Sequence, residues 1–284
     1  MMYWKPLKLL SLGAGTPSTA LALMACENKL AGRLVHTLVP VYDYILFCDL
    51  KAEPAWVYRQ LDFVRSVCDR ADIPLIVLEA DLYGCYLQNF GRSRVPAIPF
   101  WTTGPDGAQG RMPRQCTCDC KIKVMERYVR YELLGYLPRK RTKPWDKHAH
   151  EMHMGILWEE RKRAKPSKQT LFTNHYPLVE MGWTRGECFA YNRENWGLDT
   201  WASACAFCPF HTNFFYQYTK EHDIPSYDKA RRVDTLLEQY EAVPPLISRP
   251  YLSKSRKRLY ELNPQDCADA QTFLYHGQEV WNGF

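Results

Sequence analysis

The chain has 284 residues, of which 46% are hydrophobic and 14% aromatic, and its formal net charge is +6. A chain of this length and composition can bury a full core, as one large domain or a domain with an appendage, and it has too many aromatic residues for a disordered protein. No apolar stretch is long enough to span a bilayer, so we expect no membrane contact.

The positive charge is concentrated in three runs, at residues 139–143, 161–165 and 254–258. Such runs are either solvated faces or binding surfaces for a polyanion. An apolar run ending at Cys26 superficially resembles a lipoprotein signal, but the Gly-, Pro- and Ser-containing stretch 13–18 interrupts it.

The eleven cysteines are unevenly spaced and odd in number. A secreted disulfide scaffold is normally much shorter and has paired cysteines. Clustered cysteines in a chain of this size indicate metal or redox chemistry in a reducing compartment, so the expected location is the cytoplasm.

Short apolar strands alternate with helices over the first 80 residues. The expected strands are 7–12, 44–48 and 75–78, and the expected helices between them are 18–30 and 54–71. Strands and helices that alternate with short connections predict a parallel sheet with right-handed crossovers. The chain is therefore expected to have the α/β class of fold.

The second half of the chain is less regular. Residues 89–113 are rich in Gly, Pro, Arg and Thr and predict a long functional loop. Further elements are expected as helix 121–134, strand 152–157, strand 170–172, helix 184–192 and helices around 226–241. We expect an α/β domain over 1–180 and a mainly helical, cysteine-containing region over 181–284 packed on it.

The segment after the first strand is rich in small and hydroxyl residues. Gly13 and Gly15 allow a ligand to approach the backbone, and the N-terminus of the next helix offers free N–H groups and a positive dipole to phosphate. Ser11, Ser18 and Thr19 add hydroxyl groups, and Ser18 is also a candidate cap for the helix. The alternative is an ordinary turn between a strand and a helix.

This segment matches the consensus S-F-S-G-G-K-D-S-T at Ser11, Gly15, Ser18 and Thr19. Five later segments match further motifs in the same order: FCDLKAE (47–53), RQCT with KI (114–122), GILWEERKR (155–163), YPL with WTR (176–185) and SACAFCPFH (203–211). Over about 200 residues, the chain resembles the PP-loop ATP pyrophosphatases and phosphoadenosine-phosphosulfate (PAPS) reductase-like proteins, above all phage-encoded variants with S-L-G-A-G.

The resemblance implies a Rossmann-like sheet of the adenine nucleotide alpha hydrolase type that binds ATP, or PAPS or APS, with Mg²⁺. It implies that Asp49 lies near the phosphates and that Arg114, Lys121, Glu160 and Arg163 converge on phosphates, sulfate or Mg²⁺ through charge-assisted bonds. The chain departs from the consensus at two positions, where Thr16 replaces Lys and Pro17 replaces Asp. Loss of the Asp affects metal-assisted ATP cleavage more than nucleotide binding.

Cys205 and Cys208 have the spacing by which two thiolates of one turn bind the same metal or cluster. The matched family segments supply Cys116 and Cys188 as the other two candidates, with Cys118 and Cys120 in reserve. The family contains four-cysteine 4Fe–4S proteins, which makes that cluster the first choice and structural zinc the alternative. His211 is a candidate zinc ligand or a satisfied surface histidine. The other cysteines that we expect to fill the core are 26, 48, 68 and 85.

Two enzymatic reactions fit this pattern. In the first, ATP adenylates an acceptor, and a sulfur or nitrogen nucleophile displaces AMP. In the second, a sulfonucleotide is reduced, but Cys267 does not match the C-terminal redox motif of those reductases. The basic runs favour a nucleic-acid substrate and therefore the first reaction. A homo-oligomer is one possible state of the chain. A third interpretation is a zinc-stabilised nucleic-acid-binding module without catalysis.

Overall fold

The computed structural model describes residues 5–240, 247–263, 266, 274–275 and 278–279. The chain forms two compact units, neither of which is continuous in sequence. Unit 1 comprises Met1–Cys48, Trp56–Leu78 and Lys123–Ser203, and unit 2 comprises Asp49–Ala55, Glu79–Ile122 and Ala204–Phe284. This division by compactness differs from the single boundary expected at residue 180. Cys267 lies outside the described residues.

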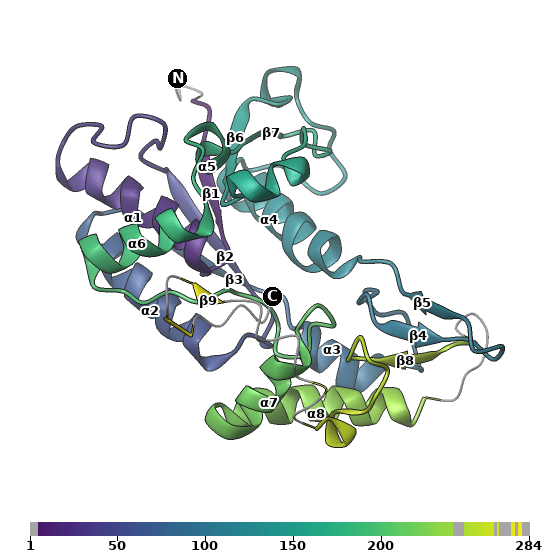
Figure 1. Cartoon of the computed structure of the whole chain (residues 1–284). Coiled ribbons are helices and arrows are strands. Elements are labelled where there is room, and N and C mark those ends of the chain that lie inside the picture. Colours follow the sequence, from purple (N-terminus) through teal and green to yellow (C-terminus); the bar gives the residue numbers. More distant parts are fainter. Residues whose placement is uncertain (1–4, 241–246, 264–265, 267–273, 276–277, 280–284) are drawn as a thin grey trace. The chain divides into compact units, whose positions relative to one another are not determined.

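Unit 1 is built on a five-stranded parallel sheet (Figure 1). Its first three strands in sequence come from apolar segments expected as strands, and the other two overlap the expected strands 152–157 and 170–172 only in part. The strand order is β3-β2-β1-β6-β7. The strands are β1 (Lys8–Leu12), β2 (Tyr44–Asp49), β3 (Leu75–Glu79), β6 (His150–Met154) and β7 (Phe172–His175). The Rossmann-like α/β class is thereby confirmed.

Unit 1 also contains helices. They are α1 (Thr16–Leu30), α2 (Ala55–Arg70), α4 (Lys123–Tyr128), α5 (Pro177–Glu180) and α6 (Arg185–Trp196). Helix α1 is buried over most of its length, as expected from its apolar composition, and it packs against α6 (Figure 1). On α4 and the π-helical turn after it, Met125 and Val129 pack with Leu9 and Leu46 of the strands.

Unit 2 contains elements that the sequence analysis did not predict. Residues expected as a long loop include β4 (Trp101–Thr103) and β5 (Gln109–Arg111), which pair antiparallel with each other, and β4 also pairs with β8 (Arg249–Tyr251). The helices of this unit are α3 (Leu82–Asn89), α7 (Asn213–His222) and α8 (Ile224–Glu238), of which only α8 was predicted. A two-stranded pair, β9 (Leu274–Tyr275) and β10 (Gln278–Glu279), completes the described elements.

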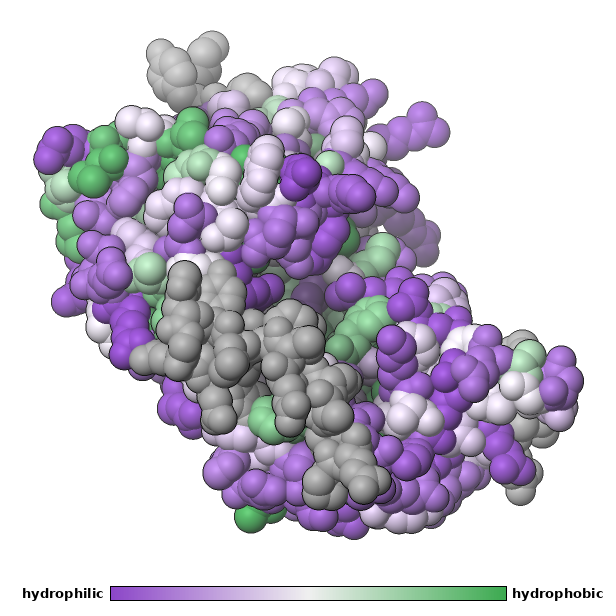
Figure 2. All heavy atoms as spheres, viewed as in Figure 1, coloured by the Kyte–Doolittle hydropathy of each residue, from purple (hydrophilic) through white to green (hydrophobic). Residues whose placement is uncertain are grey.

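The exposed surface is mainly hydrophilic, with apolar side chains in small separate groups on the face shown in Figure 2. Some of the exposed apolar residues follow α1 in sequence, at Leu34, Val35 and Leu38. Among the described helices, none is both long and apolar enough to cross a membrane.

Candidate functional site

The loop between β1 and α1 is held by the hydroxyl group of Ser18. Ser18 Oγ accepts a hydrogen bond from the Gly13 N–H over 3.1 Å and donates to the Gly15 carbonyl over 3.3 Å. Gly15 is the N-cap of α1, so the expectation that Ser18 caps the helix is wrong. Ser18 instead lies in the first turn and ties the loop back onto the helix. Ala14 adopts φ +54°, the left-handed region that the sharp turn requires.

Two other segments of unit 1 lie against this loop. A Cβ built on Gly15 would lie 2.8 Å from Ser203 Oγ and 2.9 Å from the Ser203 backbone nitrogen. A Cβ on Gly155 would lie 2.7 Å from the Ser18 nitrogen. Both glycines are therefore required by close packing of backbone on backbone. Both Gly155 and Ser203 belong to segments that match family motifs, but the sequence alone did not assign them to the loop.

The first turn of α1 has some hydrogen-bond donors that a ligand could use, but it lacks one of the usual backbone N–H groups. Thr19 is fully buried, and its Oγ1 has no hydrogen-bond partner among the described residues. The first N–H groups of a helix have no acceptor within the helix, but Pro17 in the first turn carries none. Asn192 donates to the Thr16 carbonyl over 3.1 Å and anchors the turn from α6. The loop can thus present N–H and hydroxyl donors to an anion. It has one N–H donor fewer than the consensus sequence would provide, because residue 17 is proline.

The two carboxylates expected near phosphate are each paired with a cation. Glu160 and Arg163 lie in the 3-10 helical segment Trp158–Arg163 of unit 1, and they form an ion pair of 2.6 Å with each other. Asp49, at the end of β2, accepts from the Lys51 N–H over 2.8 Å and pairs with Lys51 Nζ at 3.1 Å. These contacts explain how charged residues are held at these positions without a ligand.

Three of the four expected cysteine ligands, Cys116, Cys205 and Cys208, belong to unit 2. Cys205 and Cys208 lie in one turn, closed by the Cys208 N–H donating to the Cys205 carbonyl over 2.8 Å. Burial raises the pKa of the Cys208 thiol to about 11; Cys116 and Glu53 act in the same direction, and Arg114 opposes them. Burial also raises the pKa of the Cys205 thiol, again with contributions from Glu53, Cys208 and Cys116. Cys116 is therefore close enough to act electrostatically on both thiols.

A buried carboxylate accompanies these thiols. Glu53 is 1% exposed, and one of its oxygens lies 3.5 Å from the ammonium group of Lys121. The other oxygen, Oε2, has no hydrogen-bond partner among the described residues. An unpaired buried carboxylate oxygen costs free energy unless something else satisfies it. Glu53 belongs to the FCDLKAE segment, but the sequence alone did not assign it a role.

Zinc and an iron–sulfur cluster need differently spaced thiolates. Within the described part of the chain, no group of three or more His, Cys, Asp or Glu side chains is placed to hold a metal ion. Tetrahedral zinc brings its thiolates to within about 4 Å of one another, since each Zn–S bond is about 2.3 Å. A cluster spreads its thiolates over several iron atoms and needs a wider set. Cysteine thiolates suit either group, so the choice between zinc and a cluster belongs to the proposed function.

The fourth expected ligand, Cys188, belongs to unit 1. It belongs to α6 of unit 1, where burial raises its pKa and the charged groups that act on it are Arg185, Glu159 and Glu187. Cys188 and the three thiols of unit 2 thus belong to different units. The cysteines expected in the core behave as predicted at 26, 48 and 68, which are buried, whereas Cys85 is half-buried.

His211 is buried, which corrects the expectation of a surface histidine. Its side chain is 3% exposed, its ring stacks on Phe215, and its Nε2 lies 2.7 Å from the Cys205 carbonyl oxygen. His211 therefore supports the turn that carries the two cysteines.

No family model matches the sequence, and no curated protein matches it. Among solved structures, the chain is similar to the U34-tRNA thiolase NcsA from Methanococcus maripaludis, determined with its 4Fe–4S cluster. That likeness has a TM-score of 0.43 and 13% sequence identity, and it covers 84% of this chain and 75% of that one. The fold class rests on the parallel sheet itself.

Proposed function

We propose that the protein is a PP-loop enzyme that binds ATP through the loop between β1 and α1 and transfers AMP to an acceptor. The observation that carries the proposal is the convergence of Gly15, Gly155 and Ser203 around a helix N-terminus with a buried, unpartnered Thr19 hydroxyl. Such a loop favours an anion through N–H groups, a hydroxyl and the helix dipole.

The chemistry follows from which phosphates the loop would hold. A loop that binds the β- and γ-phosphates as a unit leaves the bond between the α- and β-phosphates to break, releasing pyrophosphate. Arg114, Lys121 and Arg163 are proposed to stabilise the negative charge that develops there. Asp49 and Glu160 would hold Mg²⁺, which supplies further charge stabilisation when bound.

The acceptor of AMP is proposed to be a nucleic-acid base, and the displacing nucleophile to be sulfur or nitrogen. The cysteines of unit 2 are proposed to hold an iron–sulfur cluster, which would supply sulfur chemistry when bound. Cys116, Cys205 and Cys208 are its proposed ligands. The resemblance assigns the fourth ligand to Cys188, and Glu53 is a second candidate that belongs to the same unit as the three thiols.

A specific observation also supports a module that binds ATP without cleaving it. Pro17 removes from the first turn of α1 both a carboxylate and an N–H group. We therefore expect weak ATP cleavage by the protein alone and faster cleavage with its acceptor. A sulfonucleotide reductase remains the third candidate.

The deciding experiment is incubation of α-labelled ATP with anaerobically purified protein, with and without bulk RNA or DNA. Labelled AMP, increased by nucleic acid, supports the proposal. Labelled ADP contradicts it. Thiol-dependent release of sulfite from PAPS or APS, without AMP from ATP, supports the reductase. ATP binding with no cleavage under any of these conditions identifies the inert module.

A further inference from the structure

Three arginines of unit 2 alternate with two aromatic rings. The Arg111 guanidinium lies 5.5 Å from the centre of the Trp101 ring and 5.1 Å from that of Phe210. Arg256 lies over Trp101 at 5.9 Å and Arg114 over Phe210 at 5.4 Å. We call these five residues the arginine–aromatic row. Guanidinium groups held against aromatic faces keep their N–H edges available for phosphate.

The row is fixed by the small antiparallel sheet. Trp101 on β4 is directly opposite Arg111 on β5, so the two side chains are a cross-strand pair. The Trp101 indole N–H donates to the Pro209 carbonyl over 2.8 Å, which ties the sheet to the segment that follows Cys208. Arg256 donates to the Thr102 carbonyl over 3.2 Å. The arginines are therefore positioned by backbone contacts as well as by the rings.

The basic run 254–258 divides into paired and unpaired cations. Lys257 pairs with Asp266 at 2.7 Å, and the buried Arg258 pairs with Asp234 at 3.3 Å. By contrast, Lys254 and Arg256, like Arg111 and Arg114, have no carboxylate within 4.0 Å among the described residues. Four cations without acidic partners thus gather in one part of unit 2, whereas solvated runs usually mix both signs.

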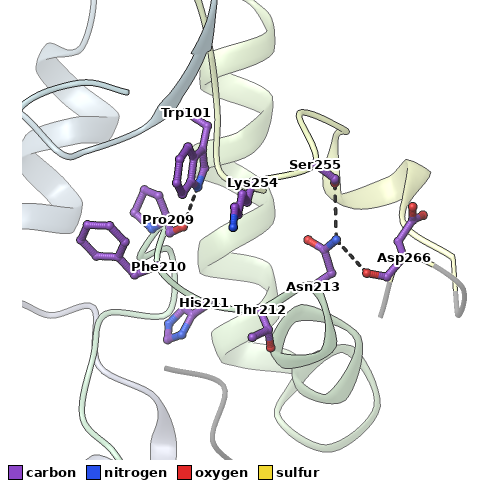
Figure 3. Close-up of a pocket in the computed structure, with 9 residues that line it drawn as sticks. All are labelled: Trp101, Pro209, Phe210, His211, Thr212, Asn213, Lys254, Ser255 and Asp266. Atoms are coloured by element: carbon purple, nitrogen blue, oxygen red, sulfur yellow. Dashed lines mark hydrogen bonds between the residues drawn. The ribbon is translucent and has the colours of Figure 1, made fainter. Parts of the chain in front are cut away.

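A pocket of about 650 Å³ adjoins the row, with Trp101 and Phe210 among its lining residues (Figure 3). Figure 3 shows Lys254 with its ammonium group directed into the space that these residues border, and Thr212 between His211 and Asn213. This size is within the usual range for small-molecule sites. Asn213, also in the lining, is already engaged, because its amide accepts from Ser253 and donates to the Asp266 carbonyl.

We propose that this surface binds single-stranded nucleic acid. Arg111 and Arg256 contact phosphates of the strand, and Lys254 contacts the nucleotide whose base enters the pocket. Arg114 lies against Phe210 and keeps its proposed role at the phosphates of ATP. A row of separated guanidinium groups matches a chain of phosphates, whereas a free mononucleotide offers charge at one place only. A single strand also exposes its bases, which a duplex does not.

This proposal rests on the proposed function, in which a nucleic-acid base accepts AMP, and it adds the surface that would bind that nucleic acid. Its test contains no ATP, so failure of strand binding and failure of AMP formation are separate results. The assay is fluorescence anisotropy of 5′-labelled single-stranded RNA and DNA oligonucleotides with the full chain, repeated from low to physiological salt.

Two variants carry the test. Arg111→Gln with Arg256→Gln should weaken binding about tenfold and reduce the slope of log affinity against log salt by about 1.4, because each arginine neutralises one phosphate of the single strand. Lys254→Gln, at an exposed position, should weaken binding without any effect on folding. Arg139→Gln with Lys140→Gln removes the same charge from another basic run and should leave binding nearly unchanged.

Other outcomes would overturn the proposal. Unchanged binding in both test variants, with weaker binding in the 139/140 control, would move the site to another basic run. Equal affinity for duplex and single strand would remove the strand assignment. Complete competition by AMP or inorganic phosphate at low millimolar concentration would identify a mononucleotide or phosphate pocket instead.

Discussion

Ser203 packs against Gly15 backbone to backbone, because a Cβ on Gly15 would lie 2.9 Å from the Ser203 nitrogen. Real Cβ atoms do not approach backbone nitrogen so closely, and the backbone of Ser203 cannot rotate away as a flexible side chain could. The nearby Gly13 differs, since its Cβ would meet only side-chain oxygens, the nearer being Ser203 Oγ at 3.1 Å. A methyl group is therefore tolerated better at Gly13 than at Gly15.

Gly15→Ala is expected to lower the free energy of unfolding by about 1–3 kcal/mol through overpacking and to abolish ATP binding. Gly13→Ala, the matched control, should cost less stability and retain part of the ATP affinity. Urea denaturation and calorimetric titration with ATP measure both quantities. Equal behaviour of the two variants would mean that the packing of Ser203 on Gly15 does not shape the loop.

Thr19→Val separates a ligand role from a structural one. The Thr19 hydroxyl is buried without a partner among the described residues, so replacing it by a methyl group should leave the unliganded protein equally or more stable. The same change should weaken ATP binding, because the hydroxyl is a proposed phosphate donor. Thermal unfolding with and without ATP tests this. If ATP raises the melting temperature of the variant as much as that of the wild type, Thr19 does not touch the nucleotide.

The first three strands of the sheet in sequence were predictable because each is a local apolar run, whereas β6 and β7 are mostly polar and overlap the expected strands only in part. Leu9, Leu10 and Leu12 are nearly inaccessible to solvent, and the alternation of such runs with helices determined the fold class. The short strands β4 and β5 were missed. Trp101 and Arg111 pair across a turn rich in Gly and Pro, and the third strand, β8, begins only at Arg249. Local periodicity carries no information about a partner so distant in sequence.

The residues of the candidate site likewise divide into those that could be predicted from the local sequence and those that could not. Ser18 and Thr19 were predictable because strand, loop and helix are adjacent in sequence. Ser203 and Glu53 were not, since one meets the loop from far along the chain and the other acts through burial beside Lys121. The units are discontinuous, so a single boundary in the sequence could not place Cys116 in one unit with Cys205 and Cys208 and leave Cys188 in the other.

Cys205→Ser and Cys208→Ser are each expected to remove most of the bound metal and to destabilise unit 2, since the free energy of metal binding is partly free energy of folding. Cys116→Ser should act in the same way. The control is Cys68→Ala, whose sulfur lies 3.7 Å from that of Cys26 in the core and which should retain the metal. Metal analysis and an optical spectrum after anaerobic purification are the measurements. Full metal content in all three serine variants would place the centre elsewhere.

The fourth ligand is assigned by comparing Glu53→Gln with Cys188→Ala. We expect Glu53→Gln to lower the metal content, because Glu53 has an unsatisfied oxygen and acts electrostatically on both Cys205 and Cys208. Cys188→Ala should retain the metal and reduce stability a little through a small cavity in α6. The reverse result, with metal absent only from Cys188→Ala, would establish the ligand that the resemblance implies. The iron-to-protein ratio gives the answer without any activity assay.

The stability of unit 1 should fall on mild acidification because of two histidines on β6. Burial lowers the pKa of both His150 and His153 below the ordinary value of 6.5, and Asp146 and Glu151 oppose that shift only in part. The folded state therefore favours the neutral imidazoles. Their contribution to stability is fully present above pH 6.5 and is lost as the pH falls from there toward the lowered pKa values. The unfolded chain gains protons first, at a cost of at most about 1.4 kcal/mol per histidine between pH 7.5 and 5.5.

Buried carboxyl groups complicate the raw pH profile. Burial raises the pKa of Asp234 and Glu126, so these groups favour the folded state at lower pH and act against the histidines. A variant isolates the effect of one histidine. His153→Gln should lower the free energy of unfolding at pH 7.5, since glutamine cannot replace the packing of the imidazole ring on Tyr42 and His175, but it should reduce the difference between pH 7.5 and 5.5. His222→Gln, at an exposed position at the end of α7, is the matched control. Urea denaturation at both pH values measures the difference, and an undiminished difference in His153→Gln would show that His153 takes up its proton alike in the folded and unfolded chains.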